Sequence, residues 1–435
     1  MAVMKNLYLG DRGVLVQYLQ LVLTRAGFPL EINGEFDRNT CAMLKAFYQS
    51  NEAMGESVGC YVDNIAWNLL IPYLKGYTTH VIVGGDTLWR IAERYHAQVA
   101  DILTANPEVD VRNLQVGTRL YIPFSYALVS EQVEYSSILN EYILEGLSVR
   151  YPFLEKGSVG ESVMGKQIPY VRMGRGNTQV FYNASFHANE WITTPVLLKF
   201  LEEYAAAFSR GENIYGENAQ QLFETYSLYL VPMVNPDGVD LVNGVINNAY
   251  YEAQTKAIAA AYPDIPYPSG WKANINGIDL NLQFPAGWEN AKETKFAAGF
   301  TTPAPRDYVG DAPLTAVESV NIYQFTLSHD FRLILAYHTQ GEVIYWKYLD
   351  YEPSGSRRIA DYFGKVSGYQ VEETPAASGY AGYKDWFIQE YNRPGYTIEA
   401  GLGENPLPMS QFPRIYRDNV GILLGGMTQI HRVGL

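Results

Sequence analysis

The chain has 435 residues, 47% of them hydrophobic and 18% charged, a composition typical of folded globular proteins with two or three domains. The formal net charge of −14 arises mainly in residues 125–435, which hold 22 Lys and Arg against 34 Asp and Glu. No basic face is evident, so nucleic acid is not an expected partner, and no run of about 18 apolar residues predicts a membrane span.

Two further features concern redox state and location. Cys41 and Cys60 are the only cysteines. They could pair with each other, but we expect buried free thiols because so few cysteines make no disulfide framework. Residues 1–13 lack the apolar stretch and cleavage site of a signal peptide. We therefore expect a cytoplasmic protein, or one whose leader has been removed.

Residues 1–77 predict a small three-helix module. Apolar residues recur at helical spacing within residues 16–23, and two further amphipathic helices follow within residues 39–49 and 65–70. The module resembles the peptidoglycan-binding type 1 family, and a dimerisation or spacer bundle is the alternative. The resemblance rests on three motifs: Val16-x-x-Leu19-Gln20, Gly34-x-Phe36 and Phe47-Tyr48-Gln49.

Residues 78–124 predict a second compact unit of βααβ order. The expected elements are a strand at residues 81–83, helices at 88–95 and 99–104, and a strand at 120–123. Asp86, in the turn before the first helix, is the expected N-cap. Trp89 and Ile91 are expected to pack in the core of the unit.

This unit resembles the LysM family, whose modules bind glycans that contain N-acetylglucosamine. The motifs that carry the resemblance are Gly85-Asp86-Thr87-Leu88-Trp89-x-Ile91-Ala92, Asn106-Pro107, Gly117 and Ile122-Pro123. In that family the sugar lies between the first turn and the loop after the second helix. The resemblance therefore implies Asp86, Thr87, Asn106 and Pro107 as glycan-binding residues.

Residues 125–435 alternate between strand-like and helical segments, which predicts an α/β domain with a mostly parallel mixed sheet and helices on both faces. A helical lead-in over residues 138–147 precedes the first strand, expected at 168–171. Residues 244–316 are rich in Pro, Gly, Tyr and Trp, and we expect them to form loops that frame a cleft more than core.

Three predicted strands of this domain lead into side chains that can bind a metal. A strand at residues 180–182 is followed by His187 and Glu190, a second strand ends in His338, and a third ends in Glu399. Ligands gather at the carboxyl ends of strands in open α/β sheets. Two imidazoles and a carboxylate provide the three protein ligands that a catalytic zinc needs beside one open position.

Five separated motifs, in this order, resemble the zinc carboxypeptidase (M14) superfamily over about residues 130–435. They are His187-x-x-Glu190, Asn235-Pro236-Asp237-Gly238, Gly277-Ile278-Asp279-Leu280-Asn281, His338 and Glu399. The resemblance implies one zinc per chain, held by His187, Glu190 and His338. Within the superfamily the chain looks closest to bacterial γ-D-glutamyl-L-diamino acid endopeptidases, which cut peptidoglycan stem peptides.

The same resemblance implies roles for three further residues. Asp279 matches the carboxylate that holds the other ring nitrogen of the first histidine. Glu399 matches the general base. Lys272 stands where the family usually has an arginine that stabilises the developing oxyanion, and a lysine supplies the charge without the planar fork.

Departures from the family pattern concern the substrate. Asn281 is kept, but Leu282 replaces the arginine that, with this asparagine, clamps a terminal carboxylate in most carboxypeptidases. Lys384 lies where the family sets specificity for the leaving group, and a cation there favours a side chain with a carboxylate, such as meso-diaminopimelate. The family's mobile tyrosine has no clean match; Tyr380 or Tyr383 could serve, and we expect Tyr380.

These features predict a zinc peptidase that two binding modules bring to peptidoglycan and its muropeptides. We expect it to cleave the γ-D-glutamyl–meso-diaminopimelate bond of stem peptides, in a mother cell or on spore-associated wall if it is cytoplasmic. One alternative is a carboxypeptidase that trims stem peptides, which requires another cation in place of the arginine missing at Leu282. The other is a non-catalytic wall-binding protein, which the retained His187, Glu190, His338 and Glu399 argue against.

Overall fold

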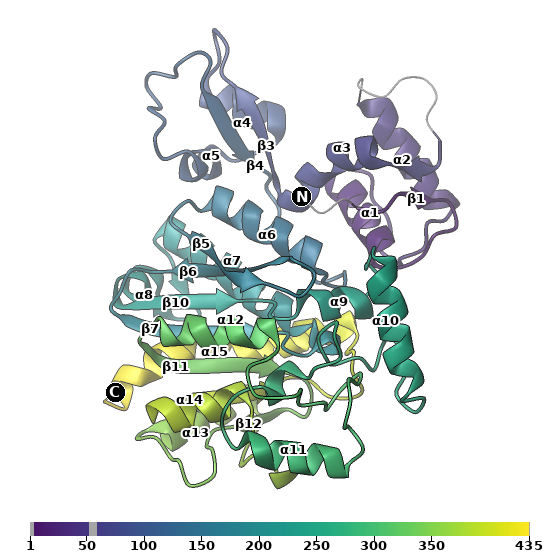
Figure 1. Cartoon of the computed structure of the whole chain (residues 1–435). Helices are drawn as coiled ribbons and strands as arrows, with labels where there is room; N and C mark the ends of the chain where they lie inside the picture. Colours follow the sequence, from purple (N-terminus) through teal and green to yellow (C-terminus); the bar gives the residue numbers. More distant parts are fainter. Residues whose placement is uncertain (1–3, 52–58, 435) are drawn as a thin grey trace. The chain divides into compact units, whose positions relative to one another are not determined.

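The computed structural model describes residues 4–51 and 59–434. The chain forms two compact units, one of Met1–Glu134 with Ile138–Glu155 and one of Tyr135–Ser137 with Lys156–Leu435 (Figure 1). None of the helices among the described residues is both long and apolar enough to cross a bilayer.

The first part of the first unit is the expected three-helix module. Its helices are α1 (Val14–Arg25), α2 (Arg38–Ser50) and α3 (Asn64–Lys75). Asp37 and Asp63 cap α2 and α3 by accepting the backbone N–H groups of Thr40 and Ala66. A short antiparallel pair, β1 (Leu7–Tyr8) with β2 (Tyr61–Val62), adds to the helices. Strands of two residues are too short to give a periodic signal in the sequence.

The expectation of free thiols is wrong, because Cys41 and Cys60 form a disulfide. Cys41 lies in the first turn of α2, and Cys60 directly precedes β2. Their Cα atoms are 5.2 Å apart, within the usual range of about 4.4–6.8 Å. This proximity depends on how α2 packs against the chain that returns to β2, which the sequence separation does not reveal.

The second part of the first unit has the expected βααβ order. Its elements are β3 (Tyr77–Val81), α4 (Leu88–Tyr95), α5 (Val99–Ala105) and β4 (Arg119–Pro123). The strands pair antiparallel, and Ile91 packs in the core. The strand expected at residues 81–83 lies earlier and ends at Val81. Thr87, not Asp86, caps α4, by accepting the N–H of Arg90.

Trp89 was expected in the core of this part, and that prediction is wrong. Its side chain is 65% exposed, whereas Ile91 is fully buried. In a short helix of eight residues, a shift of two positions turns a side chain by about 200° around the axis. The two residues therefore lie on opposite faces of α4.

Helix α6 (Ser137–Arg150) lies largely within the first unit. We expected this helix to belong to the last domain, residues 125–435. The Arg150 guanidinium donates to the carbonyl oxygens of Gly76, Phe124 and Tyr126 at 3.3, 3.0 and 2.9 Å. Lys75 and Glu145 form an ion pair at 2.8 Å. These bonds connect α6 to the end of the three-helix module and to the chain after β4.

The second unit is built on an eight-stranded mixed sheet, of order β13-β12-β14-β11-β7-β10-β6-β5. The strands are β5 (Glu155–Glu161), β6 (Gln167–Met173), β7 (Thr178–Ala184), β10 (Tyr226–Val231), β11 (Phe331–His338), β12 (Val343–Tyr345), β13 (Gln370–Glu372) and β14 (Gly395–Glu399). The central strands β14, β11, β7 and β10 are parallel to one another, and β12 and β6 join them antiparallel on either side. The predicted mostly parallel mixed sheet is confirmed.

Helices cover both faces of this sheet (Figure 1). They are α7 (Thr193–Arg210), α8 (Ala219–Thr225), α9 (Pro236–Val242), α10 (Ala249–Ala260), α11 (Trp288–Ala297), α12 (Val317–Leu327), α13 (Ser356–Ser367), α14 (Tyr383–Tyr391) and α15 (Phe412–Arg432). Short 3-10 turns are η1 (Ala188–Glu190), η2 (Leu280–Leu282), η3 (Ala376–Ser378) and η4 (Met409–Gln411), and a small hairpin joins β8 (Asn213–Ile214) to β9 (Glu217–Asn218).

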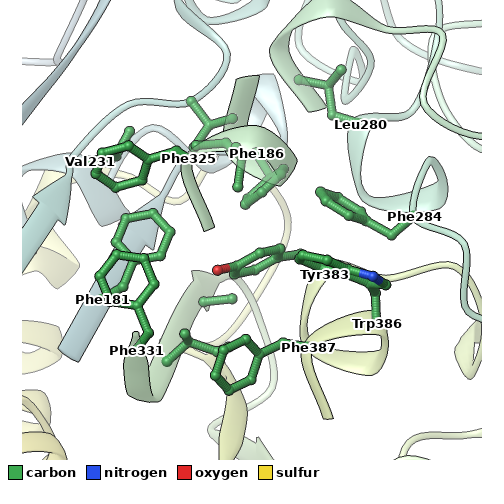
Figure 2. Packing of buried hydrophobic residues seen from close by; sticks show 14 of the residues in the cluster. Phe181, Phe186, Val231, Leu280, Phe284, Phe325, Phe331, Tyr383, Trp386 and Phe387 are labelled. Carbon is green, nitrogen blue, oxygen red and sulfur yellow. The ribbon is translucent and has the colours of Figure 1, made fainter. Parts of the chain in front are cut away.

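Successive side chains of β7 point to opposite faces of the sheet and so reach different helices. Phe181 packs edge-on against Phe325 of α12 and Tyr383 of α14 (Figure 2). Tyr182 points to the other face, where its hydroxyl donates to the carbonyl of Leu423 in α15 at 2.8 Å. Burial on both faces fixes the strand register, and with it the positions of the side chains at the strand ends.

Residues 244–316 contain more regular structure than we expected, namely α10, α11 and η2. Part of this segment is also core, because Trp271 and Ile275 are fully buried. The remainder does line a cavity, as expected, through Lys272, Asp279 and Arg306.

Candidate active site

The candidate site lies where the parallel strands β7, β11 and β14 end. His187 follows β7 and begins the η1 turn that contains Glu190, while β11 and β14 end in His338 and Glu399. His338 and Glu399 are register partners on neighbouring parallel strands. The sheet thus brings together four residues that are separated by up to 212 positions in the sequence.

His187, Glu190 and His338 present their ligand atoms to one another. The Nδ1 atoms of the two histidines are 3.2 Å apart, and Glu190 Oε1 and Oε2 lie 2.9 Å from His187 Nδ1 and 3.0 Å from His338 Nδ1. Ligand atoms bound at about 2.0–2.1 Å to a tetrahedral zinc are about 3.3–3.4 Å apart. All three residues are buried, and their ligand atoms fit a zinc ion.

Asp279 holds the other ring nitrogen of His187, at 3.1 Å from Nε2. It is positioned by its own backbone contacts, because it caps η2 and accepts the N–H of Asp307. Burial opposes ionisation of Asp279, but the charge of His187 outweighs it and holds the Asp279 pKa well below its usual range. Burial likewise opposes protonation of His187, and Glu190 and Asp279 nevertheless raise its pKa to about 9.

Lys272 and Glu399 complete the buried charged groups around the three ligands. The Lys272 Nζ is 3.4 Å from Glu190 Oε1. Burial, and then the charge of Glu190, raise the pKa of Glu399 to about 8, although Lys272 and His187 act in the opposite direction. The structure thus brings the expected base and the expected oxyanion-stabilising cation to one place.

A cavity of about 190 Å³ opens onto this group and is lined by His187, Lys272, His338 and Glu399. Asn281 and Leu282 also line it. The Asn281 side-chain oxygen accepts the N–H of Tyr383 at 2.9 Å, and Leu282 packs among Trp288, Val309 and their neighbours. An apolar side chain therefore lines the cavity at the position where the family resemblance led us to look for an arginine clamp.

Lys384 lines the cavity as expected, but it is not a free cation. Its Nζ is 2.6 Å from Asp385 Oδ1 and donates to the Lys347 carbonyl at 2.8 Å and the Thr374 hydroxyl at 3.1 Å. Only 3% of the side chain is exposed. One ion pair and two hydrogen bonds therefore already occupy this buried ammonium.

The two tyrosine candidates are placed elsewhere. Tyr380 lines a neighbouring pocket with Lys347 and Tyr348, not the cavity at the metal-ligand group. Tyr383 is buried and bonds the Thr326 hydroxyl. Tyr345 of β12 lines the cavity instead. The antiparallel pairing of β12 with β14 brings this tyrosine beside the site.

The sequence interpretation missed three further charged residues of the cavity lining, Lys295, Arg306 and Asp307. Asp307 lies 2.6 Å from both Lys295 Nζ and Arg306 Nε. These residues stand at no fixed spacing from the zinc ligands, so no motif marks them. The nearest signal was the position of the segment, within the residues expected to frame the cleft.

The glycan-binding candidates of the βααβ unit fall into two pairs. Asp86 and Asn106 use their polar atoms internally: Asp86 bonds His80 and the Val83 N–H, and Asn106 bonds the Ile102 carbonyl and the backbone of Tyr121. Thr87 and Pro107 are exposed. Asp86 and Asn106 therefore stabilise the fold of this unit.

Comparison with known proteins adds sequence relatives to this geometry. The zinc carboxypeptidase family (Peptidase M14) matches residues 141–421, and the LysM domain family matches residues 80–123. The chain is 44% identical over 400 residues to gamma-D-glutamyl-L-diamino acid endopeptidase 1 of Lysinibacillus sphaericus, covering 79% of this chain and 98% of that protein. It is 43% identical over 276 residues to the protein YqgT of Bacillus subtilis, covering 63% of this chain and 72% of that protein.

Solved structures share the fold at low sequence identity. Carboxypeptidase A from Helicoverpa armigera matches with a TM-score of 0.51 at 17% identity, covering 91% of this chain and 95% of that one. Thrombin-activatable fibrinolysis inhibitor matches with a TM-score of 0.53 at 16% identity, covering 71% and 80%. These likenesses concern the architecture alone.

Proposed function

The chain belongs to the zinc carboxypeptidase family and carries a LysM domain, and from that premise we propose that it hydrolyses the γ-D-glutamyl–meso-diaminopimelate bond of peptidoglycan stem peptides. The observation that carries this proposal is the 44% identity to a named γ-D-glutamyl-L-diamino acid endopeptidase over nearly all of that protein. Leu282, in place of the arginine clamp, supports action on substrates that do not end at the residue after the scissile bond.

The ligand geometry supports one zinc ion held by His187, Glu190 and His338. When bound there, zinc supplies Lewis-acid activation of a water molecule and of the scissile carbonyl. Asp279 fixes the His187 ring so that its Nδ1 faces the other ligand atoms. The three ligands are thus held in place before a substrate enters.

The remaining steps belong to buried groups of the chain. In this proposal Glu399 takes the proton of the attacking water and delivers it to the leaving amine. Lys272 is placed to stabilise negative charge that develops on the carbonyl oxygen, since its ammonium already lies beside the ligand group. Both groups are buried, where electrostatic interactions are stronger than in water.

The first 124 residues serve, in this proposal, to hold the enzyme on its polymeric substrate. The LysM match supports binding of N-acetylglucosamine-containing glycan, and the three-helix module over residues 1–77 stays a prediction as a peptidoglycan-binding type 1 domain. Two linked modules raise the effective concentration of the enzyme at the wall. Deleting both should weaken pull-down on insoluble peptidoglycan and leave cleavage of small soluble peptides largely intact.

The cellular location stays a prediction, and one observation bears on it. We expect a cytoplasmic protein. The Cys41–Cys60 disulfide favours an oxidising compartment, because cytosolic thiols are normally kept reduced. Rapid alkylation of cells before lysis, followed by mass spectrometry of the peptides with Cys41 and Cys60, distinguishes the two.

The direct test of the proposed function is mass spectrometry of defined muropeptides after digestion. We expect two fragments, one that ends in L-Ala-γ-D-Glu and one that begins with diaminopimelate. The Glu399→Gln variant should yield neither. On a stem tetrapeptide, which continues beyond diaminopimelate, loss of the last residue alone would instead establish carboxypeptidase action. Lys295 and Arg306 line the same cavity as Leu282. These two cations supply the positive charge that the second function, carboxypeptidase action, requires.

A further inference from the structure

Four cations line the described part of the cavity: Lys272, Lys295, Arg306 and Lys384. Lys384 is neutralised by an ion pair with Asp385 and donates two further hydrogen bonds, to the Lys347 carbonyl and the Thr374 hydroxyl. Lys272 lies against Glu190, within the metal-ligand group. Neither of these lysines offers a free charge to the carboxylate of a substrate.

Lys295 and Arg306 differ from the other two cations of the cavity because they share one carboxylate. Asp307 lies 2.6 Å from each of them, so the three side chains together carry one positive charge in excess. The bond of Arg306 to Asp307 uses Nε, and among the described residues its two terminal nitrogens carry no hydrogen bond. The Arg306 side chain is 44% exposed, which leaves its planar fork accessible from the cavity.

The backbone that carries Arg306 is anchored to the catalytic residues. The Pro305 carbonyl accepts the N–H groups of Lys272 and Ala273 at 2.8 and 2.9 Å, and the Asp307 N–H donates to Asp279 at 3.2 Å. Asp307 also adopts a φ of 64°, a left-handed conformation that costs energy for a residue other than glycine.

We propose that Arg306, with Lys295, forms a carboxylate-binding subsite in this cavity, where Leu282 offers no charge. Its ligand is a carboxylate of the residue whose amine is released, which in a stem tripeptide is a carboxylate of meso-diaminopimelate. Asp307 holds the two cations apart and in place, and the substrate carboxylate binds the remaining face of the Arg306 fork. This proposal rests on the proposed function, and it moves recognition of diaminopimelate from Lys384 to Arg306.

The test compares two peptides, L-Ala-γ-D-Glu-meso-diaminopimelate and the same peptide with both diaminopimelate carboxyl groups amidated. Hydrogen bonds to charged groups are worth about 10–100-fold in affinity. For Arg306→Gln we expect kcat/KM on the acid to fall by about that factor, mainly through KM, with little further loss on the amide. Lys295→Gln should give a smaller loss in the same direction, and Arg306→Lys an intermediate one.

Two variants serve as matched controls. Lys292 lies on the same helix as Lys295, but its ammonium lies over the Trp288 ring and does not contact Asp307. Arg175 is a carboxylate-paired arginine on the surface, bonded to Glu224. Lys292→Gln and Arg175→Gln should match the wild type on both peptides, and zinc content and circular dichroism of every variant identify any that misfold.

Binding measurements separate this proposal from the proposed function. Calorimetric titration of Glu399→Gln with each peptide reports recognition without cleavage. We expect Glu399→Gln to bind the acid more tightly than the amide, and the double variant Glu399→Gln/Arg306→Gln to lose this preference. That result supports the subsite even if the wild type cuts another bond. Equal loss of both peptides on substituting Arg306, or a preference that survives in Arg306→Gln and disappears in Lys384→Gln, overturns it.

Discussion

His80 of the LysM domain and His187 of the catalytic unit are both buried histidines beside carboxylates, and their surroundings differ in one respect. Each ring nitrogen of His80 has one partner, Asp86 at 2.8 Å and the Tyr95 hydroxyl at 3.2 Å. Asp86 also accepts a backbone N–H, so the group is satisfied within the domain. Its contribution is to stability.

The His187 group has more competing atoms than it can satisfy. His187 Nδ1 faces both Glu190 and the Nδ1 of His338, and the buried Nε2 of His338 has no partner among the described residues. Glu399 lies close enough to Glu190 for its pKa to be raised. Crowded ligand atoms with poor mutual pairing mark a site that a cation completes, whereas one-to-one pairing marks structure.

The largest expected effect tests whether Glu399 belongs to the chemistry. Glu399→Gln should retain zinc and the fold and lose about 10²–10⁴-fold in kcat, because an amide cannot accept the proton of the attacking water. Steady-state kinetics on a stem tripeptide measures the loss, with the exposed Glu404→Gln as control. Activity within a factor of a few of wild type would remove Glu399 from the mechanism.

Asp279 tests the support of the metal ligands. Asp279→Asn should lower zinc affinity or activity about 10–100-fold, because an amide holds the His187 ring less well than a carboxylate. Zinc competition with a chromogenic chelator measures affinity directly, and the exposed Asp264→Asn on the same unit is the control. Unchanged affinity and activity would show that the 3.1 Å contact to His187 has no functional role.

Asn106 tests the satisfied side of the comparison. Asn106→Ala should destabilise the LysM domain by about 2–3 kcal/mol, since one buried hydrogen bond to Ile102 and two partly buried ones to Tyr121 are lost. Hydrogen exchange of the α4 and β4 amides in the full chain reports this local stability. The exposed Asn113→Ala should leave exchange nearly unchanged. If both variants exchange alike, the Asn106 bonds do not hold the domain together.

The buried Glu399 carboxyl also predicts how the stability of the metal-free catalytic unit depends on pH. The pKa of Glu399 is about 8 in the folded protein against an ordinary value of 4.5, so between these values the folded state keeps a proton that the unfolded state has lost. Stability of the metal-free wild type should therefore fall as pH rises through this range. Glu399→Gln should lose this part of the dependence and unfold at a higher temperature at pH 7. A lower unfolding temperature for the variant would contradict the assignment.

The smallest effect concerns Trp89 on the LysM surface. Because its side chain is 65% exposed, Trp89→Ala should change the free energy of unfolding by no more than about 0.5 kcal/mol. Ile91→Ala, from the buried face of the same helix, should cost about 2–5 kcal/mol. Binding of an N-acetylglucosamine oligomer, measured by calorimetry, should weaken in Trp89→Ala if the exposed indole contacts sugar. A large loss of stability would show that Trp89 packs in the core after all.

The sequence by itself determined the order of the modules, the strand-and-helix alternation and the residues at the strand ends. Periodicity and turn residues are local, so β7, β11 and β14 could be expected together with His187, His338 and Glu399. A parallel sheet then brings its carboxyl ends to one edge without further information. The choice of His187, Glu190 and His338 as zinc ligands, and of Glu399 as base, came from the resemblance to the zinc carboxypeptidase family.

Only the tertiary structure decided which charges are paired and which side chains are exposed. Lys384 is neutralised by Asp385, whereas Lys295 and Arg306 share Asp307, and no motif distinguishes these cases. The Cys41–Cys60 disulfide and the exposure of Trp89 likewise depend on how separate segments pack. Ion pairing and burial are set by distances of a few ångströms between residues remote in the chain, and sequence spacing does not carry those distances.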